Sequence, residues 1–349
     1  MMSIIFRKKT KSYDKKSPIN KMHKSLALLY LLIICLFGVT RISEAEESDE
    51  ELKIPSDRSL KLGAYTQAGY AHWEEGREGF RIRQARVILK GDILKNIDYK
   101  LQIDAVQSPV LLDATIGINL SPYAILSFGQ FEIPFSIENL ISGSELDTIN
   151  RSNTVKNLCP GRDIGAKGRD IGATVNGEFS CLVYTLGVFN GSGINKVDTN
   201  DQLDVVGRLV FTPFHSLSIG FSHYDGRYSP DLGVPVIKKV RTGIDIFFIK
   251  DRTSMKGEYI FARDNQTERS GWYIQGGYYF IQKKLEAIVK QDSFDRNLAF
   301  GEDQIVVTTL GINCFFSKKT KVQINYEYRR GGLEKDPKNV ILAQIQAGF

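Results

Sequence analysis

Residues 99–105 read Tyr-Lys-Leu-Gln-Ile-Asp-Ala, and residues 112–120 read Leu-Asp-Ala-Thr-Ile-Gly-Ile-Asn-Leu, so apolar and polar side chains alternate along both stretches. Residues 322–329 repeat the pattern near the chain end as Val-Gln-Ile-Asn-Tyr-Glu-Tyr-Arg. Successive side chains of a β-strand point to opposite faces of the sheet. A period of two therefore predicts strands with one apolar face and one polar face.

The same alternation returns along the rest of the chain, with no convincing helical period after Leu60. Together with the three stretches above, the pattern predicts about 16 strands of about ten residues, which is typical of transmembrane antiparallel β-barrels. The other strands are expected to start near Leu60, Phe80, Ile125, Asp170, Cys181, Val205, Leu217, Thr242, Met255, Trp272, Leu285, Ile305 and Ile341.

Aromatic residues favour a barrel in a membrane over a soluble two-sheet sandwich. The chain contains 20 Phe and 15 Tyr, and many stand near expected strand ends, as a girdle at each membrane interface requires. The final strand, residues 341–349, alternates and ends in Phe349, which resembles the C-terminal signal of bacterial outer-membrane proteins. The aromatics assigned to the girdles are Tyr65, Tyr70, Tyr278, Tyr279, Phe280, Phe315, Phe316, Tyr326 and Tyr328.

The first 45 residues form a secretory signal peptide. A lysine-rich start precedes an apolar run of about 14 residues at 26–39, which is too short to span a bilayer as a helix. Cleavage is expected after Ala45, and Met22 is an alternative start with the same features. Residues 46–59 form a short acidic lead that is expected to lack regular structure, and residues 60–349 form the barrel domain.

Charge and cysteine content exclude several classes of protein. Residues 1–45 contain nine Lys or Arg and two acids, so the exported chain keeps 37 basic and 38 acidic residues. A net charge near −1 gives no electrostatic basis for binding nucleic acid. Cys159, Cys181 and Cys314 match no metal or redox spacing, although a bond between Cys159 and Cys181 is possible. No cofactor or metal is expected.

The longest stretch without alternation runs from Glu132 to about Lys167, longer than an ordinary connection. Inside it lies a tandem repeat, Gly-Arg-Asp-Ile-Gly-Ala-Lys at 161–167 followed by Gly-Arg-Asp-Ile-Gly-Ala-Thr at 168–174. Seven is an odd number, so two copies in one strand would swap its faces. One copy is therefore expected in a strand and the other in a loop.

Several motifs in this region are similar to those of the phosphate-selective porin O and P family. They are Gly-Gln-Phe-Glu-Ile-Pro-Phe-Ser-Ile-Glu at 129–138, Asn-Arg-Ser at 150–152 and Pro-Gly-Arg-Asp-Ile-Gly at 160–165. Later motifs at 187–193, 207–213 and 257–259 follow in the family's order. The resemblance implies homotrimers of 16-stranded barrels in the outer membrane of a Gram-negative-type bacterium, surrounded by lipid and lipopolysaccharide. It also implies a third loop that folds inward and narrows the pore.

The resemblance implies that basic residues contact the passing anion, with Arg151 and Arg162 at matching motif positions. A guanidinium holds a phosphate oxygen by charge-assisted hydrogen bonds, and several weak sites in series let the ion leave. Three positions depart from strongly phosphate-selective members, because Tyr65, Gln84 and Asn139 stand where those members carry basic residues. The full set of candidate pore-lining residues is Arg151, Arg162, Lys156, Arg83, Arg86 and Lys100.

These observations predict a passive, water-filled porin for small anions such as phosphate or polyphosphate. The alternatives are a general diffusion porin with weak anion preference and a purely structural barrel. Arg86 and Lys100 also have a simpler interpretation, in which they solvate a wall alongside Asp104 and Asp113. An enzyme is not expected, because no Ser or Cys beside a histidine forms a recognisable nucleophile motif.

Overall fold

The computed structural model describes residues 51–54, 58–74, 76, 78–106, 108–301, 303–332 and 338–349. They all belong to one unit, Ala45–Phe349. The predicted signal peptide and its cleavage after Ala45 lie outside the described residues, and so does most of the acidic lead.

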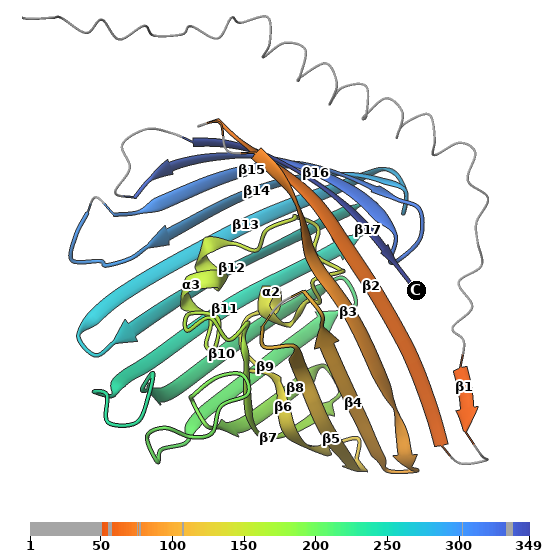
Figure 1. Ribbon diagram of the computed structural model, residues 1–349, viewed down its shortest axis with the longest axis vertical. Helices are drawn as coiled ribbons and strands as arrows, with labels where there is room; N and C mark the ends of the chain where they lie inside the picture. The colour runs from red at the N-terminus through yellow and green to blue at the C-terminus, as the bar shows by residue number, and fades with distance from the viewer. Residues whose placement is uncertain are drawn as a thin grey trace, which may run out of the picture. The chain divides into compact units, whose positions relative to one another are not determined.

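A single closed antiparallel sheet forms the body of this unit (Figure 1). Each strand from β2 to β17 pairs with the next, and β17 pairs with β2 from Val340 opposite Trp73 to Gly348 opposite Tyr65. Among the described residues this gives the predicted 16-stranded barrel, which is confirmed. The strands are β2 (Arg58–Trp73), β3 (Glu78–Leu94), β4 (Ile97–Asp104), β5 (Leu111–Ser121), β6 (Ala124–Glu132), β7 (Arg169–Phe179), β8 (Leu182–Phe189), β9 (Asp204–Phe214), β10 (Leu217–Tyr228), β11 (Ile237–Lys250), β12 (Thr253–Asp264), β13 (Thr267–Ile281), β14 (Leu285–Asp295), β15 (Ile305–Phe315), β16 (Lys321–Gly331) and β17 (Lys338–Gly348).

One short strand lies outside the closed barrel. β1 (Glu51–Ile54) pairs antiparallel with the beginning of β2, from Glu51 opposite Lys61 to Ile54 opposite Arg58. It falls within the acidic lead for which no regular structure was expected, and β2 itself begins two residues before the expected boundary at residue 60.

Burial along the strands is the reverse of that in a soluble protein. Apolar side chains such as Ile116, Ile244 and Val289 are 52–56% exposed, whereas Asp113 and Lys290, on the opposite face, are almost fully buried. An outward apolar surface suits contact with lipid, and a polar interior suits water. None of the described helices is long and apolar enough to cross a membrane.

Exposed aromatics gather where strands end. Tyr123 stacks on Phe179 with ring centroids 4.8 Å apart beside one set of short turns. Tyr70 and Phe80 lie 5.0 Å apart at the junction of β2 and β3, at the other end of the barrel. Tyr65 was wrongly placed in this girdle, because it is only 4% exposed. Its strand phase puts it on the polar face with Gln67.

Residues 133–168 connect β6 to β7 and carry two short helices, α2 (Ile137–Leu140) and α3 (Asn153–Leu158). Both helices are drawn within the outline of the barrel in Figure 1, and α3 contacts β12, β13 and β14. The loop copy of the tandem repeat ends this segment, and the other copy begins β7 at Arg169. The expected division between loop and strand is confirmed.

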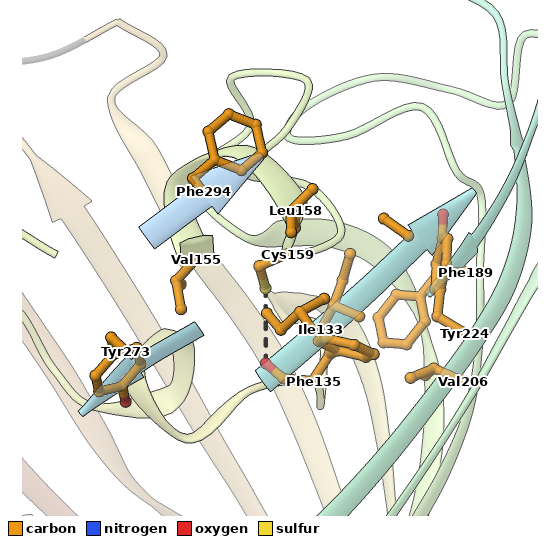
Figure 2. Close-up of a cluster of buried hydrophobic side chains, with 12 residues drawn as sticks. Ile133, Phe135, Val155, Leu158, Cys159, Phe189, Val206, Tyr224, Tyr273 and Phe294 are labelled. Atoms are coloured by element: carbon orange, nitrogen blue, oxygen red, sulfur yellow. Dashed lines mark hydrogen bonds between the residues drawn. The ribbon is translucent and has the colours of Figure 1, made fainter. Parts of the chain in front are cut away.

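An apolar cluster packs segment 133–168 against the wall (Figure 2). Phe135, Val155 and Leu158 of the segment are fully buried against strand residues that include Phe189 and Tyr273. The cluster accounts for the local sequence, because the segment needs apolar side chains on the side that meets the wall.

Candidate functional site

Three acidic residues of segment 133–168 bind basic residues of the barrel wall. Glu138 lies 2.5 Å from Lys290, and both side chains are buried. Asp147 lies 2.7 Å from Lys256. Although burial acts to raise it, the ammonium group of Lys290 lowers the pKa of Glu138 to about 2. The carboxylate of Glu138 is therefore charged at neutral pH.

The third acid, Asp163, belongs to the loop copy of the repeat. Its Oδ2 atom lies 2.5 Å from Lys239 Nζ and 2.8 Å from Arg241 Nη2, both on β11. Arg241 also donates to the carbonyl of Leu158 at 3.0 Å. The segment is thus bound to β11 at Leu158 and at Asp163.

Polar capping groups add to these ion pairs. Asp292 of β14 accepts hydrogen bonds from the backbone N–H of Asn153 at 2.6 Å and from the hydroxyl of Thr154 at 3.0 Å. Its carboxylate therefore sits at the first turn of α3, where backbone donors lack partners within the helix. Ser152 supplies the N-cap and accepts from Val155 N–H at 3.1 Å.

Arg83 reaches the segment because β3 has a bulge. Gln67 pairs with Gln84 and the next residue of β2 pairs with Ile82, so Arg83 is the extra residue. It donates to the carbonyl of Ile149 at 2.7 Å and to the side chain of Asn150 at 3.2 Å. In this structure Arg83 therefore holds the segment to β3.

Arg86 and Lys100 are both paired with wall acids. Arg86 Nε lies 3.2 Å from Asp104, and the two side chains are buried. Lys100 Nζ lies 2.7 Å from Asp113, which also binds Arg169 at 2.6 Å. Their charges are largely compensated within the wall, as the simpler interpretation of these two residues expects.

The basic residues of the segment itself have different surroundings. Arg151 donates to the carbonyl of Ile141 at 2.6 Å, and Arg162 donates to the side-chain oxygen of Asn139 at 2.5 Å. Lys156 is exposed on α3. The pKa of Arg162 is lowered, first by burial and then by the positive charge of Arg151. The two arginines that the sequence singled out therefore interact electrostatically.

The three departures from the family pattern are uncharged side chains. Tyr65 donates to Gln84 at 2.9 Å between β2 and β3, and Asn139 is the acceptor for Arg162. Hydroxyl and amide groups thus occupy these positions without adding positive charge.

The cysteines form no disulfide between Cys159 and Cys181. Cys159 is fully buried in the apolar cluster, where burial raises the pKa of its thiol well above the ordinary value. Its sulfur lies 3.7 Å from the carbonyl oxygen of Phe135 (Figure 2). The described residues contain no group of three or more His, Cys, Asp or Glu able to hold a metal ion.

A closed barrel with an apolar outside, a polar inside and a long segment bound to its strands defines a β-barrel channel protein of the porin class. Residues 62–246 match the family model described as phosphate-selective porin O and P. Because this match covers more than half of the chain, the protein belongs to that family. Family and fold point to an outer-membrane channel rather than an enzyme.

Solved structures with the same fold have low sequence identity to this chain. An anion-selective porin from Comamonas acidovorans gives a TM-score of 0.67 at 12% identity, over 84% of this chain and 100% of that one. The outer membrane channel DcaP of Acinetobacter baumannii gives 0.62 at 12%, over 85% and 99%. The trimer form of OmpT from Vibrio cholerae gives 0.59 at 11%, over 84% and 100%. No curated protein sequence matches the chain.

Sequence reasoning missed the wall residues that bind the segment, chiefly Lys290, Lys256 and Arg241. Their positions in the strand alternation mark them as inward-facing, which was a usable signal. Which acid each one binds depends on how the segment crosses the barrel, and no periodicity encodes that path.

Proposed function

We propose that this protein is a passive outer-membrane porin that favours small anions of the phosphate type. The proposal depends on one observation: most acidic residues of segment 133–168 are paired with basic residues of the wall, whereas its basic residues are not paired with acids. Segment 133–168 contains four acidic and four basic residues, so it is neutral in sequence. Three of its acids bind wall lysines or arginines.

The four basic residues have no such compensation. Within the part of the chain that the structure describes, none of them lies within ion-pair distance of a carboxylate, and the charges of Arg151 and Arg162 reinforce each other. An unpaired cation beside water attracts anions by about 1 kcal/mol at 4 Å, or about fivefold in local concentration. The basic residues of the segment are Arg151, Lys156, Arg162 and Lys167.

A general diffusion porin with weak anion preference is the second candidate. The neutral contact between Tyr65 and Gln84 favours it, since neither of these two side chains is a positively charged donor. Loss of such donors reduces preference for a dianion over chloride without closing the passage.

We also propose a homotrimer in a bilayer that carries lipopolysaccharide. A groove beside β2, β3 and β17 has Ala64, Ala85 and Ala347 among its lining residues, together with larger side chains such as Val87 and Phe349. Small residues allow close approach of packed segments in a membrane. The trimer form of the structurally similar OmpT supports the same assembly.

The test is the reversal potential of purified channels in planar bilayers under a KCl gradient. The double substitution Arg151→Ala and Arg162→Ala is expected to move the potential toward zero. The control pair Arg252→Ala and Arg263→Ala removes the same charge from exposed positions and should leave the potential unchanged.

Restoring charge at the two positions with lysine separates electrostatics from folding. Arg151→Lys with Arg162→Lys should keep the anion preference. If the double alanine variant selects ions as the unmodified channel does, these two residues do not set selectivity.

A further inference from the structure

Two adjacent turns at one end of the barrel carry a group of basic residues. The connections at this end, such as residues 251–252 and 282–284, are short, whereas the opposite end carries segment 133–168. Because the short turns of such barrels face the periplasm, this end lies at the inner surface of the outer membrane. The basic turn surface consists of Lys250, Arg252, Lys283 and Lys284.

Hydrogen bonds place the two turns side by side. The backbone carbonyl of Arg252 accepts from the N–H of Tyr279 at 2.8 Å, and the guanidinium of Arg252 donates to the carbonyl of Phe280 at 3.3 Å. All four basic residues of the surface are exposed. The two turns therefore present one continuous cationic surface to their surroundings.

The positive charge of the basic turn surface has little compensation. Within the described part of the chain, no carboxylate lies within ion-pair distance of its four cationic groups. Asp251 is the one acidic residue in the two turns. Turns 122–123, 180–181 and 215–216, at the same end of the barrel, contain no lysine or arginine. The cationic surface is thus a local feature and not a property of the whole rim.

Outward-facing aromatic and apolar side chains border the basic turn surface. Tyr278 and Phe280 of β13 are 45% and 59% exposed, and their rings lie 5.4 Å apart. Met255 of β12, close to the first turn, is also exposed. Aromatic rings at the ends of membrane-spanning strands lie at the level of the lipid headgroups. The basic residues just beyond these rings therefore lie at the level of the phospholipid phosphates.

The groove proposed for the trimer contact lies elsewhere on the barrel. It is bordered by β2, β3 and β17, whereas the basic turn surface joins β11 to β12 and β13 to β14. The next turn along the chain carries Lys318 and Lys319, but Thr320 beside them lines that groove. Lys319 also donates to the backbone oxygen of Phe349 at 3.1 Å. A trimer formed at the groove leaves the basic turn surface in contact with lipid.

We propose that the basic turn surface, together with Met255, Tyr278 and Phe280, is a binding site for an anionic phospholipid of the periplasmic leaflet. The acyl chains pack against the apolar and aromatic side chains, and the headgroup phosphate accepts charge-assisted hydrogen bonds from the basic residues. Apolar side chains directly beside the cations favour a lipid over a wholly polar anionic polymer such as peptidoglycan. This inference goes beyond the proposed function, because it concerns the lipid around the barrel and not the ions that pass through it.

The experiment titrates the purified barrel, in a zwitterionic detergent, with dioleoylphosphatidylglycerol and counts retained lipid by native mass spectrometry. Dioleoylphosphatidylcholine has the same acyl chains without net charge and is the reference lipid. The combined variant Lys250→Gln, Lys283→Gln and Lys284→Gln should need at least about tenfold more phosphatidylglycerol for half-saturation, because each basic residue near an anionic lipid surface contributes about fivefold.

A matched control variant removes the same charge from the opposite end of the barrel. Lys196→Gln, Lys238→Gln and Arg263→Gln replace three exposed basic residues there and should leave half-saturation unchanged. Glycerol phosphate carries a phosphate headgroup without acyl chains and should compete poorly with phosphatidylglycerol. Equal competition would mean that the surface binds free phosphate esters and would overturn the lipid site.

The remaining outcomes each decide for or against the lipid site. Equal half-saturation in the combined variant and the unmodified barrel overturns it, and so does equal retention of the two phospholipids by the unmodified barrel. If the combined variant binds isolated peptidoglycan less well but retains phosphatidylglycerol, the surface docks peptidoglycan instead. If the combined variant does not fold, salt decides: retention of phosphatidylglycerol by the unmodified barrel that falls as NaCl rises supports the site, and retention independent of salt overturns it.

The reversal potential separates this inference from the proposed function. The combined variant should keep the anion preference of the unmodified channel while it loses the preference for phosphatidylglycerol. A channel without anion preference that still retains phosphatidylglycerol through these residues would remove the porin proposal and leave the lipid site in place.

Discussion

Replacing Lys290 by methionine tests how strongly segment 133–168 is bound to the wall. Lys290 and Glu138 are 3% and 0% exposed and 2.5 Å apart. Removing one partner of such a buried pair typically destabilises by about 3–5 kcal/mol, because the remaining charge stays buried. This change shifts the equilibrium between the bound and the detached segment toward the detached form by roughly a hundredfold to a few thousandfold.

Two readouts follow the detachment. Single-channel recordings of Lys290→Met should show frequent transitions between conductance levels, and the barrel should lose its heat resistance on gel electrophoresis at a lower temperature. The effect should be larger at pH 8 than at pH 5, because Glu138 without its cation gains a proton more readily and then carries no buried charge.

Two further variants test whether the effect of Lys290→Met comes from the unpaired buried charge of Glu138. Lys238 and Asp225 form an exposed pair at 3.5 Å, so Lys238→Met should change stability by about 0–1 kcal/mol. The double variant Glu138→Gln with Lys290→Met leaves no unpaired buried charge and should recover much of the loss. If Lys290→Met changes stability and conductance as little as Lys238→Met does, the attachment of the segment does not depend on the ion pair between Glu138 and Lys290.

Two further predictions concern pH and thiol chemistry. The pKa of Glu138 is lowered from an ordinary 4.5 to about 2, so its contribution to segment attachment is fully present above pH 4.5 and is lost as pH falls toward 2. Current traces should therefore be steady from pH 7 to pH 5 and noisy near pH 2, and steady traces at pH 2 would argue against this linkage. A maleimide reagent should label the half-buried Cys181 in the folded barrel and Cys159 only after unfolding, as peptide mapping would report. Labelling of folded protein at Cys159 would mean that the apolar cluster opens.

The strand pattern was readable from the sequence because the barrel places two different solvents on its two faces. Ile116 meets lipid and Asp113 meets the interior, so a period of two in polarity follows directly from the fold. The repeat at 161–174 was resolved by the same argument, since an odd spacing cannot keep both copies in one strand. The prediction for Tyr65 was wrong because a position near a strand end does not determine which face of the strand the side chain occupies.

The candidate site was less accessible to sequence reasoning. Arg151 and Arg162 were found through their motifs, but the partners of a basic residue depend on contacts between segments distant in sequence. Arg86 and Lys100 show this, because their nearest carboxylates neutralise them. Arg83 faces segment 133–168 only because β3 has a bulge, and strict alternation does not predict where one occurs.

The sign of the reversal potential of the unmodified channel in a tenfold KCl gradient tests the division of charge most directly. With segment acids bound to the wall and segment bases uncompensated, the potential should have the sign of chloride preference and should decrease in magnitude as salt rises and screens these charges. A potassium preference, or a potential near zero at low salt, would contradict the claim that the basic residues of the segment are uncompensated.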